Sequence, residues 1–120
     1  EHWPSWNKGV RSMTLHGSVA TGTSFEWKAG PGTIKSRIAE VDPPHRIVWT
    51  GVTLGIKAVD AFSFEASEGG TLVRQAESWE GLPVRFLRSR MERTLRGSLR
   101  EGLRSLKSEA ERRAAAAAAA

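Results

Sequence analysis

Residues 56–80 read IKAVDAFSFEASEGGTLVRQAESWE, and this stretch decides the fold class. Apolar and polar side chains alternate with a period of two on both sides of the turn-forming run at 67–70. Two alternating segments joined by a short glycine-containing turn are typical of an antiparallel hairpin. The stretch therefore predicts two neighbouring strands, at 56–66 and 71–80.

Four further segments upstream have the same character. They lie at 10–16, 23–29, 33–41 and 46–50, and glycine- or proline-rich breaks separate them. Gly51 and Gly55 are expected to bracket the loop before the hairpin. Six strands joined in order by short turns predict an antiparallel meander.

The period changes after Gly81, and the change predicts one long amphipathic helix at about 82–112. Gly102 falls on its apolar side, where a missing side chain lets the helix approach the sheet closely or leaves room. We expect that side to face the sheet, so that Gly102→Leu overpacks at a cost of roughly 1–3 kcal/mol. The stripe consists of Val84, Leu87, Met91, Leu95, Leu99, Leu103 and Leu106. The predicted fold class is α+β, a curved antiparallel sheet with a long C-terminal helix.

Length and composition indicate one domain. The chain has 120 residues, 39% of them hydrophobic, and no cysteine, which excludes disulfide scaffolds and cysteine nucleophiles. No apolar run is long enough to cross a membrane, and no secretory leader opens the sequence, so we expect a cytoplasmic protein. Residues 114–120 are all alanine, and we treat them as a tail outside the domain.

The positive charge is concentrated in the predicted helix. Residues 82–113 hold ten basic and four acidic side chains, whereas the whole chain has a formal net charge of +5. Such a face binds phosphates in nucleic acids or at membranes, or it is simply solvated and paired along the helix. We favour the solvated face over a nucleic-acid or membrane partner.

Five segments carry a resemblance to a known family. They are WPSWN at 3–7, GTSFEW at 22–27, SRIAEVDPPHRIVWTG at 36–51, GGTLV at 69–73 and ESWEG at 77–81. In this order they resemble the polyketide cyclase/dehydrase and lipid-transport group of the START-like (Bet v 1-like, SRPBCC) superfamily. The resemblance covers residues 1–112 and is specific for the fold, but hardly for the function.

The resemblance implies a helix-grip fold, in which a seven-stranded antiparallel sheet wraps round the C-terminal helix and encloses an apolar cavity. Family members normally have one more strand and a short helix before Trp3, so residues 1–113 are expected to form a single START-like domain without them. An unpaired sheet edge invites pairing with another chain. We therefore expect either a longer sequence than this one or a homo-oligomer.

Aromatic side chains on the predicted strands are candidates for the walls of a ligand cavity, with core packing as the alternative. Such cavities bind apolar or aromatic molecules and fix them with a few polar groups. The candidate ligand-binding residues are Trp27, Ser36, Trp49, Asp60, Phe62, Phe64, Gln75, Glu77, Trp79, Phe86 and Arg88.

Asp60, Gln75 and Glu77 form the most informative polar set. By alternation they share one face, and closing the hairpin brings Asp60 opposite Gln75 or Glu77. If that face is interior, burial disfavours ionisation and raises at least one carboxyl pKa. Alternatively the acids are solvated, or Arg88 lies beside them and keeps both ionised.

Three functions remain open at this point. The first is a carrier or sensor of an apolar, aromatic, lipid- or polyketide-like molecule, and the second is a cyclase or dehydratase with Asp60 or Glu77 as general base. The third is an interaction module that uses the basic helix. The sequence contains no glycine-rich phosphate loop, and its histidines (His2, His16 and His45) are dispersed, so we expect neither a cofactor nor a metal.

Overall fold

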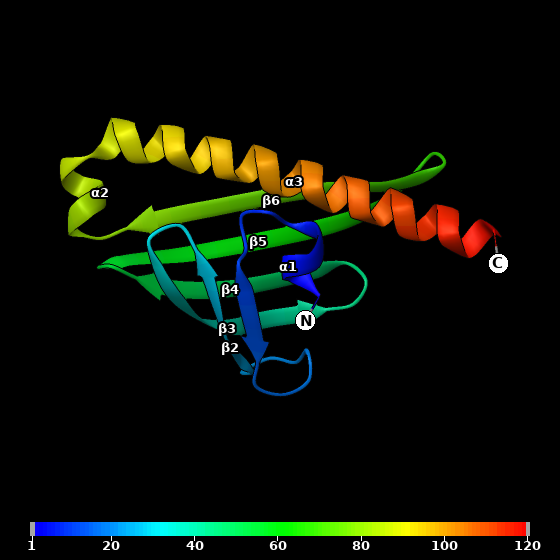
Figure 1. Cartoon of the computed structure of the whole chain (residues 1–120), viewed down its shortest axis with the longest axis horizontal. Coiled ribbons are helices and arrows are strands. Elements are labelled where there is room, and N and C mark those ends of the chain that lie inside the picture. The colour runs from blue at the N-terminus through cyan, green and yellow to red at the C-terminus, as the bar shows by residue number, and fades with distance from the viewer. Residues whose placement is uncertain (1, 120) are drawn as a thin grey trace.

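The computed structural model describes residues 2–119, and its centre is one antiparallel sheet (Figure 1). The strand order is β1-β2-β3-β4-β5-β6, so each strand pairs with its neighbours in the sequence. This confirms the predicted meander. The strands are β1 (Ser12–Leu15), β2 (Ser24–Ala29), β3 (Gly32–Asp42), β4 (Arg46–Thr53), β5 (Ile56–Ser67) and β6 (Gly70–Glu80).

Three helices accompany the sheet: α1 (Trp3–Trp6), α2 (Leu82–Phe86) and α3 (Arg88–Ala119). The prediction of one unbroken helix at 82–112 is wrong at both ends. Leu87 leaves the helical region, with φ −121° and ψ 36°, so α2 is a separate short helix. At the other end α3 continues through the alanine run, since alanine is the best helix former. None of the helices in residues 2–119 is both long and apolar enough to span a membrane.

A close backbone crossing holds α2 against the sheet. Gly81 has φ 132°, and a Cβ atom on it would overlap the carbonyl oxygen of Gly55. Only glycine fits there, because other residues rarely adopt this φ and the neighbouring atom belongs to the backbone. The loop expected from Gly51 to Gly55 is shorter than predicted, since β4 runs to Thr53 and only Leu54 and Gly55 connect it to β5.

Helix α3 runs alongside β6 (Figure 1). Met91, Leu95 and Leu99 are half-buried on α3, which confirms the predicted helix phase in this region. Gly102 is also half-buried, yet a Cβ atom there would meet nothing within 4 Å. We expected a side chain at Gly102 to overpack. For its Cβ atom this expectation is wrong, because the helix leaves open space at that point.

The space between helix and sheet is loosely filled. Only Val10, Phe25, Ile38 and Val48 are buried apolar residues in the described part of the chain. The accessible surface is 8527 Å², against about 6,400 Å² for a compact monomer of this mass. On the inner face of the sheet, Trp49, Phe62 and Trp79 are each half-buried, so this face is only partly covered.

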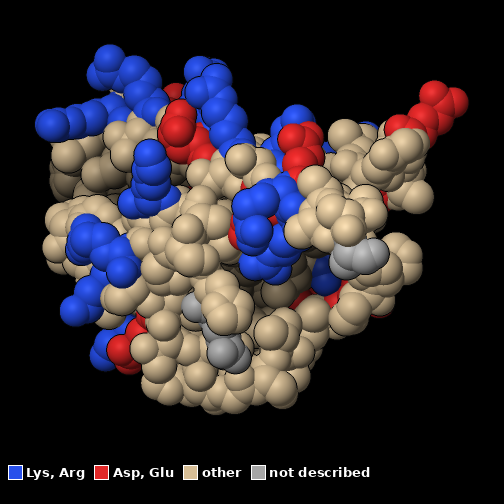
Figure 2. Space-filling model, turned by 45° about the vertical axis from the view of Figure 1, so that its right-hand side comes forward, with Lys and Arg blue, Asp and Glu red and all other residues tan. Residues whose placement is uncertain are grey.

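Basic side chains dominate the outside of the molecule. Figure 2 shows Lys and Arg gathered along the upper edge and the left side of the face in view, with fewer Asp and Glu among them. Several acids are paired on the surface: Glu101 with Arg104 at 3.2 Å and Glu111 with Lys107 at 2.6 Å. Such exposed pairs contribute little stability.

Candidate functional site

The register of the sheet brings the candidate polar residues to one face. Asp60 on β5 lies directly opposite Glu77 on β6, and Phe62 lies opposite Gln75. On the other side of β5, Asp60 lies opposite Trp49 of β4. This confirms the alignment inferred from closing the hairpin.

An aromatic row crosses the same face. The Trp49 and Phe62 rings are stacked with centroids 5.1 Å apart, and Phe62 and Phe64 follow at 6.3 Å. At the other end Trp3 of α1 lies 4.7 Å from Trp27 and 5.8 Å from Trp49. Helix α1 therefore packs on this face of the sheet. Trp3 was not among the candidates, although two tryptophans in the first six residues were a signal for it.

The candidate polar cluster consists of Asp60, Gln75, Glu77 and Trp79. Asp60 is only 6% exposed, and both of its carboxylate oxygens accept a hydrogen bond from Gln75 Nε2 at 3.0 Å. Glu77 Oε2 accepts one from Trp79 Nε1 at 2.5 Å. One acceptor, Gln75 Oε1, is buried and has no hydrogen-bond partner among the described residues.

Burial governs the ionisation of the two acids. Desolvation raises the pKa of Asp60, while hydrogen bonds from Glu77 and Gln75 act in the opposite direction. The pKa of Glu77 rises from 4.5 to about 8 because of burial first, then its hydrogen bond to Asp60 and the charge of Asp60. With a pKa of about 8, Glu77 holds its proton at neutral pH, next to a second carboxyl whose pKa is also raised.

A second polar contact lies further along the face. Trp27 Nε1 donates to Ser36 Oγ at 3.0 Å, and Ser36 is 6% exposed. The hydroxyl thereby satisfies the indole N–H inside the aromatic row. The hydrogen-bonded pair Trp27 and Ser36 lies on the same face of the sheet as the polar cluster.

Two predicted site residues lie elsewhere. Phe86 is 81% exposed on α2, so it is not part of the wall that the sequence indicated. Arg88 is exposed at the start of α3, and no ion pair within residues 2–119 joins it to Asp60 or Glu77. The alternative in which Arg88 keeps both acids ionised is therefore wrong in this structure. Both residues flank Leu87, where the helical segment is interrupted.

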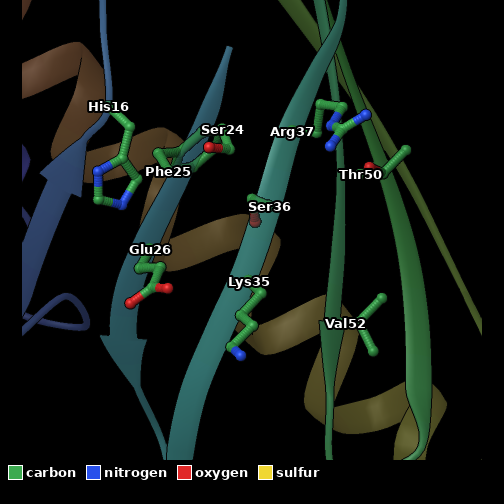
Figure 3. Close-up of a pocket in the computed structure, with 9 residues that line it drawn as sticks. All are labelled: His16, Ser24, Phe25, Glu26, Lys35, Ser36, Arg37, Thr50 and Val52. Carbon is green, nitrogen blue, oxygen red and sulfur yellow. The ribbon is translucent and has the colours of Figure 1, made fainter. Parts of the chain in front are cut away.

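One open hollow lies away from this cluster. It encloses about 340 Å³ around β2, β3 and β4, and Glu26, Lys35 and Arg37 lie around it (Figure 3). These residues alternate with Trp27, Ser36 and Ile38, so their side chains belong to the other face of the sheet. The hollow is open and has charged side chains around it, but Phe25 and Ser36 also line it, so it borders the aromatic face.

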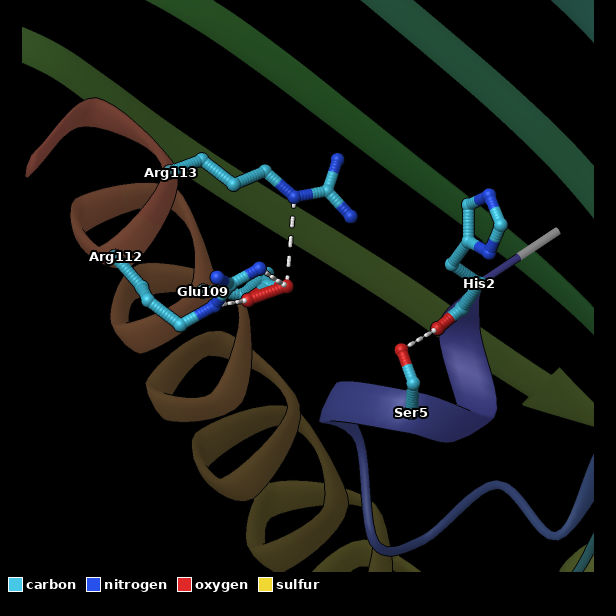
Figure 4. Close-up of polar contacts among 5 residues, drawn as sticks. All are labelled: His2, Ser5, Glu109, Arg112 and Arg113. Carbon is cyan, nitrogen blue, oxygen red and sulfur yellow. Dashed lines mark hydrogen bonds and ion pairs between the residues drawn. The ribbon is translucent and has the colours of Figure 1, made fainter. Parts of the chain in front are cut away.

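Another ionic cluster lies on α3, near α1 (Figure 4). Glu109 is 9% exposed and accepts hydrogen bonds from Arg112 at 3.0 Å and Arg113 at 3.4 Å. The hydrogen bond from Arg112 keeps the pKa of Glu109 below its usual value. Because every charge here has a partner, we assign this cluster a structural role.

No grouping of three or more His, Cys, Asp or Glu side chains suited to a metal ion occurs within residues 2–119.

Comparison with known proteins identifies one family and several solved structures of similar fold. A family model described as polyketide cyclase / dehydrase and lipid transport matches residues 1–111. No curated protein shows a significant match. A hypothetical protein from Helicobacter pylori has a similar structure, with a TM-score of 0.75 and 16% identity over 88% of this chain and 70% of that one. A protein from Rhodobacter sphaeroides matches with a TM-score of 0.59 and 17% identity, over 90% of this chain and 75% of that one.

Proposed function

The chain belongs to the polyketide cyclase/dehydrase and lipid transport family, and we propose that it binds an apolar or aromatic small molecule as a carrier or sensor. The binding site is the aromatic face of the sheet, between β3–β6 and the apolar stripe of α3. That face is only partly covered by the protein itself, so apolar surface is available to a ligand.

The unpartnered oxygen of Gln75 carries this proposal. A buried acceptor without a donor is costly, and a ligand that brings a hydroxyl or N–H group removes that cost. The other polar atoms of the cluster already hydrogen-bond one another and hold Gln75 in place. We infer that the ligand places a hydrogen-bond donor beside Gln75 and its apolar body along Trp49 and Phe62.

Catalysis is the second candidate, and a different observation favours it. Glu77, with a pKa of about 8, holds a proton near neutral pH and lies opposite a second carboxyl group, that of Asp60. A cyclase or dehydratase needs such a general acid and general base on one face of its substrate. In this reading Glu77 donates a proton and Asp60 accepts one, while the aromatic row orients the folded substrate.

The test begins with native mass spectrometry of the freshly purified protein, which would reveal a retained molecule. Tryptophan fluorescence then compares the binding of two probes, 1-naphthol and naphthalene, which differ by one hydroxyl group. We expect 1-naphthol to bind about two- to tenfold more tightly, the value of one net hydrogen bond. In Gln75→Met this preference should disappear, while naphthalene binding is kept.

Arg74→Gln is the matched control, because Arg74 neighbours Gln75 in β6 but pairs with Glu65 at 3.3 Å on the other face. It should leave both affinities unchanged. Equal affinity for the two probes in the unmodified protein would contradict the role of Gln75. Turnover of a polyketide-like substrate that is lost in Glu77→Gln, with binding retained, would favour the enzyme.

A further inference from the structure

Large apolar side chains are exposed together at the end of the molecule that carries α2. Phe86 is 81% exposed and Leu82 63%, and the neighbouring Leu87 is 46% exposed. Leu54 at the tip of the β4–β5 turn is 63% exposed. The turn adjoins α2, since a Cβ atom on Gly55 would lie 3.7 Å from Pro83 Cδ. We call these four side chains the apolar tip: Leu54, Leu82, Phe86 and Leu87.

Arginines surround the apolar tip. An open hollow where α2 meets α3 is bordered by Phe86 and Leu87 together with four cations, Arg85, Arg88, Arg90 and Arg93. Residues 81–91 contain no acidic residue. The acids that flank this segment are Glu80 at the end of β6 and Glu92 in the first turns of α3. The tip therefore combines exposed apolar surface with a local excess of positive charge.

An anionic lipid surface matches both properties at once. Apolar side chains gain free energy when they enter the boundary between headgroups and acyl chains, and nearby arginines gain from the negative surface potential. A nucleic acid would use the arginines but would leave Phe86 and Leu82 in water. A second copy of the chain would bring its own four arginines against these, which is repulsive.

We propose that this end of the molecule docks on anionic lipid bilayers, with Phe86 and Leu82 inserted among the headgroups and Arg85 and Arg88 on the lipid phosphates. The proposal does not depend on the ligand or on catalysis. Docking at this end would bring the polar cluster close to the bilayer, from which a ligand could enter. Glu77 lies only three residues before the end of β6, about 10 Å from the docking end.

The first test is co-sedimentation of the full chain with vesicles. Vesicles of equal parts phosphatidylcholine and phosphatidylglycerol should bind the protein, pure phosphatidylcholine should not, and added salt should weaken binding. Phe86→Ser should reduce the affinity at least tenfold, because it removes an inserted phenyl ring. Each of Arg85→Gln and Arg88→Gln should reduce it about fivefold.

The matched control is the double variant Arg96→Gln/Arg100→Gln, which removes the same two charges further along α3 as the double variant Arg85→Gln/Arg88→Gln removes at the tip. This pair should bind vesicles nearly as well as the unmodified protein. An equal loss in the control pair would show that net charge alone drives binding and would overturn the proposal. Failure to bind anionic vesicles at low salt would also overturn the proposal. So would a protein that binds duplex RNA or DNA but not vesicles, if Phe86→Ser leaves its nucleic-acid binding unchanged.

The second test reports the depth of insertion. The chain has no cysteine, so Phe86→Cys can be labelled at one site with a polarity-sensitive dye. Its emission should shift to the blue on anionic vesicles. Leu72→Cys is the control, because Leu72 is 43% exposed near the opposite end of the β5–β6 hairpin, and its label should not respond. A shift of equal size at both positions would contradict docking through the apolar tip. Circular dichroism of every variant shows whether it is folded.

Discussion

Asp60 and Glu77 lie directly opposite each other on β5 and β6, and burial raises the pKa of both carboxyl groups. Gln75 donates to Asp60 from the same strand as Glu77, and Trp79 donates to Glu77. The pair is therefore held by neighbours on one face of the hairpin, where it faces aromatic side chains and no cation.

The first prediction concerns the pH dependence of stability. Glu77 has a pKa of about 8 in the folded protein and about 4.5 when unfolded, so the folded state binds the proton more tightly. Its stabilising contribution is complete below pH 4.5 and is lost as the pH rises towards 8. We expect the free energy of unfolding to fall across this window, with a slope of at most about 1.4 kcal/mol per pH unit.

Urea denaturation followed by tryptophan fluorescence measures this slope. Glu77→Gln should flatten it, because the amide does not titrate. Glu65→Gln serves as the control, since Glu65 is exposed and paired with Arg74. An unchanged slope in Glu77→Gln would show that other groups cause the pH dependence.

The second prediction concerns the coupling within the pair. Asp60→Asn removes the negative charge and a hydrogen-bond acceptor, both of which raise the pKa of Glu77. The pKa of Glu77 should fall in this variant but stay above its ordinary value, because burial is the largest cause of the shift and remains. Carboxyl carbon-13 NMR titration provides the measurement. A Glu77 pKa that is the same in both proteins would mean that the two groups do not interact.

The third prediction concerns the backbone crossing at Gly81. Gly81→Ala places a Cβ atom against the carbonyl oxygen of Gly55 at a φ of 132°. Backbone must move to relieve this contact, so we expect the free energy of unfolding to drop by more than about 1–3 kcal/mol. Gly69→Ala in the β5–β6 turn is the comparison, since it has a positive φ but open space around its Cβ. Equal losses in the two variants would show that φ alone matters.

The fourth prediction concerns Gly102 on the inner side of α3. Gly102→Ala fills open space and improves helix propensity, so it should stabilise the protein by up to about 1 kcal/mol. Gly97→Ala should have a similar effect, because it too lies in α3 without neighbours within 4 Å of its Cβ. Thermal unfolding compares the two. A loss of stability in Gly102→Ala alone would mean that α3 packs closer to the sheet than it does here.

The sequence by itself determined the sheet and the polar cluster. Alternation with a period of two assigns each side chain to a face, and a short turn at 67–70 fixes the register of the hairpin. The local pattern therefore placed Asp60 opposite Gln75 or Glu77, and the register of the folded sheet selects Glu77. The apolar spacing of α3 likewise indicated which side of the helix faces inward.

Only the tertiary structure decided how the helical segment begins. The contact between Gly81 and Gly55 joins positions 26 residues apart, and no local pattern reports such a crossing. The break at Leu87 follows it, between the exposed Phe86 and Arg88, which lies away from the acids. The contacts of Trp3 with Trp27 and Trp49 also depend on the tertiary structure. The folded sheet brings these rings together, and the spacing of the residues along the chain does not report it.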